Sequence, residues 1–281
     1  MNINNSDWSS KMDIKTIYTE FGKLNVNLSG DYYGAAFWDK IESGFYEPDT
    51  IFFLKKFVNA DTDFIDLGVA NGAISLLAAL RGARVLGFEA MPDIYRVATS
   101  NIEINDLDSQ IELRNSAISD VSGGGLKLIK TSDPSILSSI TFGNLEDAQV
   151  EIEVEGLGEA IASFWQNNRA LVIKMDIEGA EWKILKNEDV VRCLRACQAV
   201  VLLAIHPGFQ RPYSTQRIIP VHLSKLIWHL RNIYECVRVF TRISKYAKVL
   251  RTNLDLVRSP KRTAALMLGG YHEFILDFKS K

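Results

Sequence analysis

The sequence is poor in the residues that mark several common protein classes, cysteine first among them. It has three cysteines, Cys193, Cys197 and Cys236, an odd and sparse set that does not make a disulfide framework. Cys193 and Cys197 are four residues apart, a same-face helical spacing and not the C-x-x-C of a zinc or redox site. We therefore expect buried thiols in a reducing compartment.

Long apolar runs and a strong charge of one sign are also missing. No run is long enough to cross a bilayer, and residues 1–15 have neither the basic region nor the apolar core of a secretory signal. The formal net charge is only −2, which argues against a protein that mainly binds nucleic acid or an anionic membrane. These absences predict a cytoplasmic protein without a transmembrane segment or a nucleic-acid partner.

Apolar runs of strand length alternate with helical segments over most of the chain, whose 281 residues are 47% hydrophobic. This alternation predicts an α/β fold with a mostly parallel sheet and helices on both faces. Residues 1–60 are expected to be a lead-in that packs on the core, 61–281 the main domain, and 241–262 a basic insertion or lid. Residues 119–155 are expected to carry a hairpin. The expected strands lie at 63–68, 83–90, 110–118, 170–177, 199–207, 234–240 and 271–278.

The first of these strands ends in a glycine turn that leads directly into a helix. Gly68 and Gly72 allow the turn to tighten and the helix to begin close to a ligand. The spacing Gly-x-Ala-x-Gly, with Ala70 and Asn71 inside it, lacks the third glycine of the fingerprint that holds a pyrophosphate. Asp66, at the strand end, can bind a ligand's ammonium group or anchor the turn. We expect all five residues in a cofactor site.

The second and third strands end in residues that suit a nucleoside. Glu89 follows Asp66 by 23 residues, and an acidic side chain at that place accepts hydrogen bonds from ribose hydroxyls. Ala90 comes directly after it. Ser116, Ala117 and Ile118 lie at the end of the third strand, where the edge of an adenine would lie, and Asp120 follows close by. The sequence leaves open which of them contacts the base.

Further along the chain the motifs become specific. The run Ile173–Glu181, with its K-x-D-x-E-G-A-E pattern, resembles the signature of the FkbM-type methyltransferases. Three shorter segments agree with it: Gly44–Pro48, Phe88–Pro92 and Ala117–Asp120. Together the resemblance covers about residues 44–206. One position departs from the family, because members commonly carry Asn where this chain has Ala70.

The resemblance implies a class I methyltransferase Rossmann-like fold, with a seven-stranded, mostly parallel sheet whose last strand is antiparallel. It implies S-adenosylmethionine as the cofactor. The expected reaction is methyl transfer to a hydroxyl oxygen of a sugar, a polyketide or a related small metabolite. The expected partner is therefore a small-molecule or glycosidic acceptor.

Acidic residues gather after the fourth strand. Asp176 and Glu178 are expected to act in catalysis, Asp176 also to contact the cofactor, and Glu181 to bind the acceptor, as is Glu47. Oxygen ligands at Asp176 and Glu178 could hold a divalent cation, and metal dependence stays open. A structural alternative is that Glu178 and Glu181 are helix N-terminal acids. His206, at the end of the fifth strand, is expected to be the general base, since imidazole titrates near neutrality.

Other functions fit parts of this pattern. An NAD-dependent oxidoreductase would use the same ribose-binding Glu89, but the missing glycine weakens it. A nucleic-acid methyltransferase would often carry an Asp/Asn-Pro-Pro-Tyr-like tetrapeptide where this chain has 176–179. A module that binds the cofactor without catalysis is a third alternative. The sequence also leaves open whether the chain forms a homo-oligomer and whether 241–262 is a solvated helix face, a lid or a lipid-binding surface.

Overall fold

The structure is a computed structural model, and its chain divides into two compact parts, residues 1–115 and 116–281. Each part is described by itself. The described residues are 12–123, 126–129, 149–177, 180–205, 233–257, 259–268 and 273–279.

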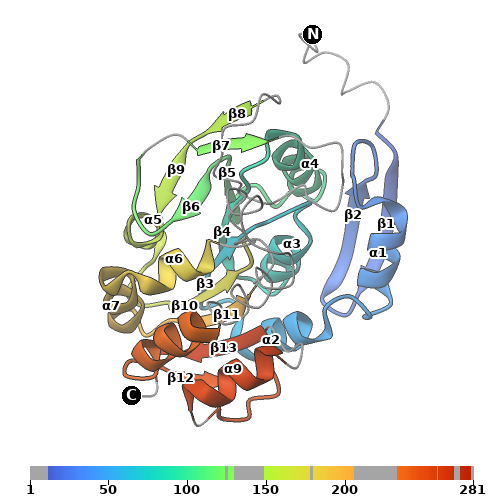
Figure 1. Ribbon diagram of the computed structural model, residues 1–281. Helices are drawn as coiled ribbons and strands as arrows, with labels where there is room; N and C mark the ends of the chain where they lie inside the picture. The colour runs from blue at the N-terminus through green and yellow to red at the C-terminus, as the bar shows by residue number, and fades with distance from the viewer. Residues whose placement is uncertain are drawn as a thin grey trace, which may run out of the picture. The chain divides into compact units, whose positions relative to one another are not determined.

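The first part opens with an antiparallel hairpin of β1 (Ile14–Thr19) and β2 (Gly22–Asn27), in which Thr19 pairs with Gly22. Helix α1 (Gly34–Glu42) lies beside β1 (Figure 1). Two contacts fix it there: Lys15 forms an ion pair with Asp39, and the backbone N–H of Tyr18 donates to Glu42 at 2.9 Å. Helix α2 (Pro48–Phe57) follows and starts at a proline, a residue whose fixed φ suits the first helical position.

The rest of the first part is a strand–helix alternation. Strands β3 (Thr62–Leu67), β4 (Arg84–Phe88) and β5 (Ile111–Arg114) pair in parallel in that order. Helices α3 (Ala73–Leu80) and α4 (Pro92–Glu103) connect them. All six residues of β3 are buried, including the polar Thr62, Asp63 and Asp66, as expected for a central strand covered on both faces. The carboxyl ends of β3 and β4 therefore lie side by side.

The second part begins with the predicted hairpin-bearing region. Strands β7 (Leu126–Ile129) and β8 (Gln149–Ile152) are antiparallel, while β6 (Ala117–Ser119) pairs in parallel with β9 (Val154–Gly156). Helix α5 (Leu157–Phe164) follows. The next elements are β10 (Ala170–Met175), α6 (Glu181–Lys186), α7 (Glu188–Ala196) and β11 (Val200–Ala204). The chain ends with β12 (Lys248–Leu250), α9 (Pro260–Leu268) and β13 (Glu273–Asp277).

Strand β11 is parallel to β10, and β13 runs antiparallel to both β11 and β12. With the three strands of the first part, these four make up the seven described strands of the main sheet. The predicted fold class, a seven-stranded and mostly parallel α/β sheet with an antiparallel last strand, is confirmed.

The predicted strand at 234–240 is wrong. Residues 233–243 form a helix, and the remaining sheet strand is β12, inside the segment 241–262. The apolar residues of YECVRVF alternate over a few positions, but their burial follows helical spacing. The buried positions are Cys236, Val239, Phe240 and Ile243.

None of the helices among the described residues combines the length and apolarity that crossing a membrane requires. The three thiols are free; Cys236 is buried, as expected, whereas Cys193 and Cys197 are only half-buried, so the expectation of buried thiols is wrong for these two. Burial raises the pKa of Cys236 to about 12, and burial together with the neighbouring Cys193 does the same for Cys197. Such thiols stay protonated near neutrality, as expected for structural cysteines.

Candidate functional site

The glycine turn after β3 has an unusual backbone, because three alternate residues take positive φ. Gly68, Ala70 and Gly72 have φ of 88°, 54° and 95°. The N–H groups of Gly68 and Val69 both donate to the carbonyl of Phe88, at 3.1 Å each, which joins the turn to the end of β4. Gly68 and Ala70 are half-buried, whereas Gly72 is buried. The accessible face of the turn is thus made by positions 68 and 70.

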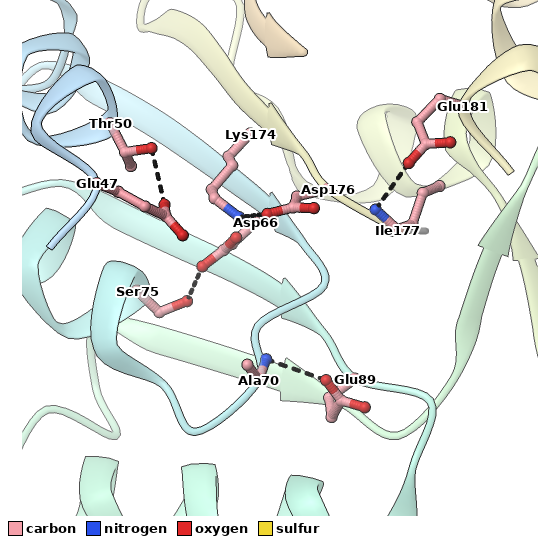
Figure 2. Close-up of polar contacts among 10 residues, drawn as sticks. All are labelled: Glu47, Thr50, Asp66, Ala70, Ser75, Glu89, Lys174, Asp176, Ile177 and Glu181. Carbon is pink, nitrogen blue, oxygen red and sulfur yellow. Dashed lines mark hydrogen bonds and ion pairs between the residues drawn. The ribbon is translucent and has the colours of Figure 1, made fainter. Parts of the chain in front are cut away.

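Asp66, near the end of β3, anchors this turn to the helix that follows it. Its carboxylate is fully buried, and its Oδ2 accepts a 2.7 Å hydrogen bond from the hydroxyl of Ser75 in α3 (Figure 2). The bond fastens the end of β3 to the first turn of the next helix. Of the two roles that the sequence leaves open for Asp66, anchoring the turn is the one that this contact favours.

Glu89 ends β4 and turns its carboxylate back to the glycine turn. Its Oε2 accepts from the N–H of Ala70 at 3.0 Å (Figure 2). Its Oε1 accepts from the N–H of Met91 at 2.9 Å. The residue is 9% exposed. Burial raises the pKa of Glu89 to about 7 and the charge of Asp66 adds to the rise, against the lowering effect of these backbone donors. The N–H of Ala90 is a third backbone donor to this carboxylate, which leaves about one of its roughly four lone-pair sites for another donor.

Two residues that support Glu89 were missed by sequence reasoning. A Cβ at Gly87 would lie 2.6 Å from Val69 Cγ2 and 2.9 Å from Leu113 Cδ1, so only glycine lets the turn pack on β4. The amide of Asn115 donates to the carbonyl of Glu89 at 2.8 Å and to that of Ala90 at 3.2 Å, which fixes the backbone after the strand. A glycine inside a strand pattern is a signal of close approach that could have identified Gly87.

Asn71 is held by residues from far along the chain. Its Nδ2 donates to Asp31 Oδ2 at 3.2 Å, and Asp31 Oδ2 also accepts from Trp38 Nε1 at 2.7 Å. The amide of Asn101 in α4 donates to the Asn71 carbonyl at 2.8 Å and accepts from the N–H of Asn27 at 2.7 Å. Asn71 is 1% exposed, and among the described residues its Oδ1 has no donor. That oxygen is a buried acceptor in need of a donor.

In the second part, Ser116 and Ala117 are buried. The hydroxyl of Ser116 donates to Glu155 at 2.6 Å, and the N–H of Ala117 donates to the carbonyl of residue 153 at 2.9 Å. Nearby, Lys183 lies 3.1 Å from Asp120. Partial burial works to raise the pKa of Asp120, but hydrogen bonds and the charge of Lys183 outweigh it, so this pKa lies below its ordinary value.

The acidic residues after β10 have partners of their own. Lys174, which is 6% exposed, lies 2.8 Å from Asp176 (Figure 2). Glu181 is fully buried at the start of α6, and its Oε1 accepts from the N–H of Ile177 at 3.3 Å. Glu178 and His206 lie outside the described residues.

Glu47 precedes α2 with a left-handed backbone, at φ 38° and ψ 65°. Its Oε2 accepts a hydrogen bond from the hydroxyl of Thr50 at 2.9 Å (Figure 2). A positive φ is uncommon for a residue with a Cβ and is found at functional sites more often than elsewhere.

The hydrogen-bond acceptors around the glycine turn of the first part fit S-adenosylmethionine. Glu89 offers its remaining acceptor site to a ribose hydroxyl, and Asn71 Oδ1 offers an acceptor to the ammonium of the methionine part. The cofactor has no phosphate, and the two carboxylates near the turn, Asp66 and Glu89, would repel one. The described residues do not contain a group of three or more His, Cys, Asp or Glu side chains that could hold a metal ion.

The chain is similar to known methyltransferases. A ribosomal protein L11 methyltransferase of Clostridium perfringens is 26% identical to this chain over 144 residues. One of Thermosipho africanus is 30% identical to it over 141 residues. These matches cover 51% and 44% of this chain and 45% and 52% of the relatives, so the chain spans about half the length of the curated relatives it matches.

Among solved structures, a geranyl diphosphate methyltransferase in complex with S-adenosylmethionine aligns with a TM-score of 0.41 at 12% identity, over 86% of this chain and 88% of that one. The methyltransferase FkbM domain matches residues 66–225. Because that match covers more than half of the chain, the protein belongs to the FkbM methyltransferase domain family, whose cofactor is S-adenosylmethionine.

Proposed function

We propose that the protein transfers a methyl group from S-adenosylmethionine to a hydroxyl oxygen of a sugar, polyketide or related small metabolite. The assignment of the cofactor rests on one observation, the buried carboxylate of Glu89 after β4. It faces the accessible part of the glycine turn, where it accepts a hydrogen bond from the N–H of Ala70. Family membership supports methyl transfer. The choice of a hydroxyl acceptor rests on the family resemblance in the sequence.

The contacts of the cofactor residues support the roles that we propose for them. Glu89 accepts a hydrogen bond from a ribose hydroxyl, and Asn71 accepts one from the ammonium group through Oδ1. The half-buried backbone of Gly68 and Ala70 allows the methionine part to come close. Ser116 and Ala117 stay proposed neighbours of the adenine; because the Ser116 hydroxyl already donates to Glu155, we assign any contact there to the backbone.

The bound cofactor supplies an electrophilic methyl group on a sulfonium. Glu89 and Asn71 would hold the cofactor, and the methyl group that it supplies would pass to the acceptor oxygen and leave S-adenosylhomocysteine as the second product. The acceptor proton must leave, and His206 is our proposed base. Asp176, held by Lys174, would orient the acceptor hydroxyl, with Glu178 beside it in sequence and Glu181 and Glu47 as further acceptor contacts.

A protein side chain is the second candidate acceptor, because the relatives are named for ribosomal protein L11. Both candidates need the same cofactor site and differ only in the acceptor. We propose the small metabolite, a cytoplasmic site of action and no nucleic-acid partner. The net charge of −2 supports the last of these.

The cofactor assignment is tested by calorimetry with S-adenosylhomocysteine. Glu89→Ala is expected to weaken its binding by about 1–3 kcal/mol, because a charged hydrogen-bond acceptor is lost. Glu112→Ala is the matched control, since this carboxylate lies on β5 and pairs with Arg114. Equal affinities for the wild type and Glu89→Ala would remove the ribose assignment.

Methyl transfer itself is tested by the accumulation of S-adenosylhomocysteine with small hydroxyl acceptors and, separately, with ribosomal protein L11. Turnover on the small acceptors supports the proposal. Turnover on the protein alone would replace it with the second candidate, and binding of the cofactor without any turnover would make the protein a binding module.

A further inference from the structure

Aromatic side chains gather on the surface around α1. We call Tyr32, Tyr33, Phe37, Phe45 and Tyr46 the aromatic surface. Ring centroids lie 5.8 Å apart for Tyr32 and Tyr33, 5.1 Å for Tyr33 and Phe37, and 4.7 Å for Phe37 and Tyr46. Phe45 is 82% exposed, Tyr32 53% and Tyr33 41%. So much exposed aromatic area in one short segment is typical of a binding site and not of an inert surface.

Charge around these rings selects against anions. Residues 31–50 contain five carboxylates and a single lysine. Four of the carboxylates already have partners: Asp31 accepts from Trp38, Asp39 pairs with Lys15, Glu42 accepts from Tyr18, and Glu47 accepts from Thr50. Of these four partners only Lys15 carries a positive charge, so the segment keeps a net negative charge that repels phosphates and acids.

The aromatic surface is joined to the cofactor turn by Asp31. This side chain is 9% exposed, and it accepts from the N–H of Tyr33 at 2.9 Å, from Trp38 Nε1 and from Asn71 Nδ2. One carboxylate thus fixes the start of α1, its buried tryptophan and the turn that would hold the cofactor. Trp38 in turn packs edge-on to Phe37 at 5.2 Å. The rings and the turn form one continuous structure.

We propose that the aromatic surface binds the acceptor, and that the acceptor is an uncharged pyranoside. A pyranose ring has an apolar C–H face that packs on an aromatic ring, and hydroxyls at its rim that bond to water and to tyrosine hydroxyls. The inference rests on the proposed function and names the acceptor class and its binding place. The left-handed backbone of Glu47, next to Tyr46, fits a functional segment held in a strained conformation.

The test uses the full chain saturated with S-adenosylhomocysteine and a panel of neutral methyl pyranosides, with binding followed by saturation-transfer NMR. Tyr32→Ala and Phe45→Ala are expected to raise the half-saturating pyranoside concentration by about threefold to tenfold, the size of one aromatic contact. Tyr234→Ala is the matched control, a tyrosine that is 63% exposed in the second part of the chain. All three variants should keep the wild-type affinity for S-adenosylhomocysteine.

Two comparison probes separate the alternatives. Glucose 6-phosphate should bind more weakly than the neutral glucoside, and a pentalysine peptide should not displace the glycosides. The inference is overturned if no pyranoside binds, if Tyr32→Ala and Phe45→Ala bind as the wild type does, or if the peptide binds in their place. The proposed function fails separately, when S-adenosylhomocysteine itself does not bind to the wild type.

Discussion

Replacement of Glu89 by glutamine should change how stability depends on pH. Burial raises the pKa of Glu89 from its ordinary value of 4.5 to about 7 in the folded chain. Between these values the folded protein holds a proton that the unfolded chain has released. Stability contributed by this group is therefore lost as the pH rises from about 4.5 to 7.

The size of the effect follows from the pKa. A rise from 4.5 to about 7 corresponds, at about 1.4 kcal/mol for each pH unit, to about 3 kcal/mol of lost stability at pH 8. Glu89→Gln has no charge to bury and escapes this loss. Its one cost is an amide N–H₂ that faces a backbone donor, of Ala70 or Met91, and this cost does not depend on pH.

Urea unfolding followed by circular dichroism at several pH values measures the difference. The free energy of unfolding of Glu89→Gln, relative to the wild type, should rise by about 3 kcal/mol between pH 4.5 and 8. Glu112→Gln, at an exposed strand position, is the control and should show no such rise. Stability curves for Glu89→Gln and the wild type that run parallel over this range would refute the reasoning.

The same carboxylate predicts a proton linkage in cofactor binding. A ribose hydroxyl donates to the charged form of Glu89 and lowers its pKa, so S-adenosylhomocysteine should bind more tightly as the pH rises from 5 to 7. Calorimetry in buffers with different ionisation enthalpies should then detect protons released on binding. Release that persists unchanged in Glu89→Gln would assign the proton to another group.

Four further predictions concern single residues. Gly87→Ala should destabilise the fold by about 1–3 kcal/mol, because its Cβ meets Val69, and urea unfolding would contradict this with an unchanged midpoint. Ala70→Asn should stabilise it by about 0.5–1 kcal/mol in the same assay, since asparagine tolerates positive φ better, and a loss of stability would contradict this. Asp31→Ala should lower the free energy of unfolding by about 1–3 kcal/mol, because the buried donors of Trp38 and Asn71 lose their acceptor. It should also weaken the binding of S-adenosylhomocysteine in calorimetry, and unchanged binding would show that Asp31 does not support the turn. His206→Ala should keep cofactor affinity and lower turnover by roughly 10²–10⁴-fold, as for a general base, and wild-type rates would exclude that role.

The features that the sequence predicts well are local ones. A buried strand such as β11 is a continuous apolar run. The turn after β3 needs glycine at fixed places, so Gly68 and Gly72 are visible without a structure. The acidic residue at the end of the next strand is visible too, since a parallel sheet places the ends of neighbouring strands together. For these reasons the fold class and the position of Glu89 could be predicted.

Features that depend on distant contacts could not be predicted in the same way. Asp31 is 40 residues from Asn71, and Asn101 is 30 residues from it; only the folded chain brings them together. A short apolar run such as 234–240 fits a strand and a helix equally well until packing decides between them. The sequence also pointed to Ser116 as an adenine neighbour without revealing that Glu155 engages its hydroxyl.

The remaining acceptor capacity of Glu89 and the strained backbone of the turn beside it favour one kind of ligand. Ala70 keeps φ at 54° although its Cβ disfavours this, which requires the surrounding contacts to over-determine the turn. Glu89 is likewise held where burial and the charge of Asp66 penalise its ionised form. A ligand that donates a hydroxyl hydrogen to Glu89 relieves that penalty, whereas a pyrophosphate would add negative charge to it. The energetics of the turn therefore favour a nucleoside without phosphate over a dinucleotide, independently of the missing third glycine.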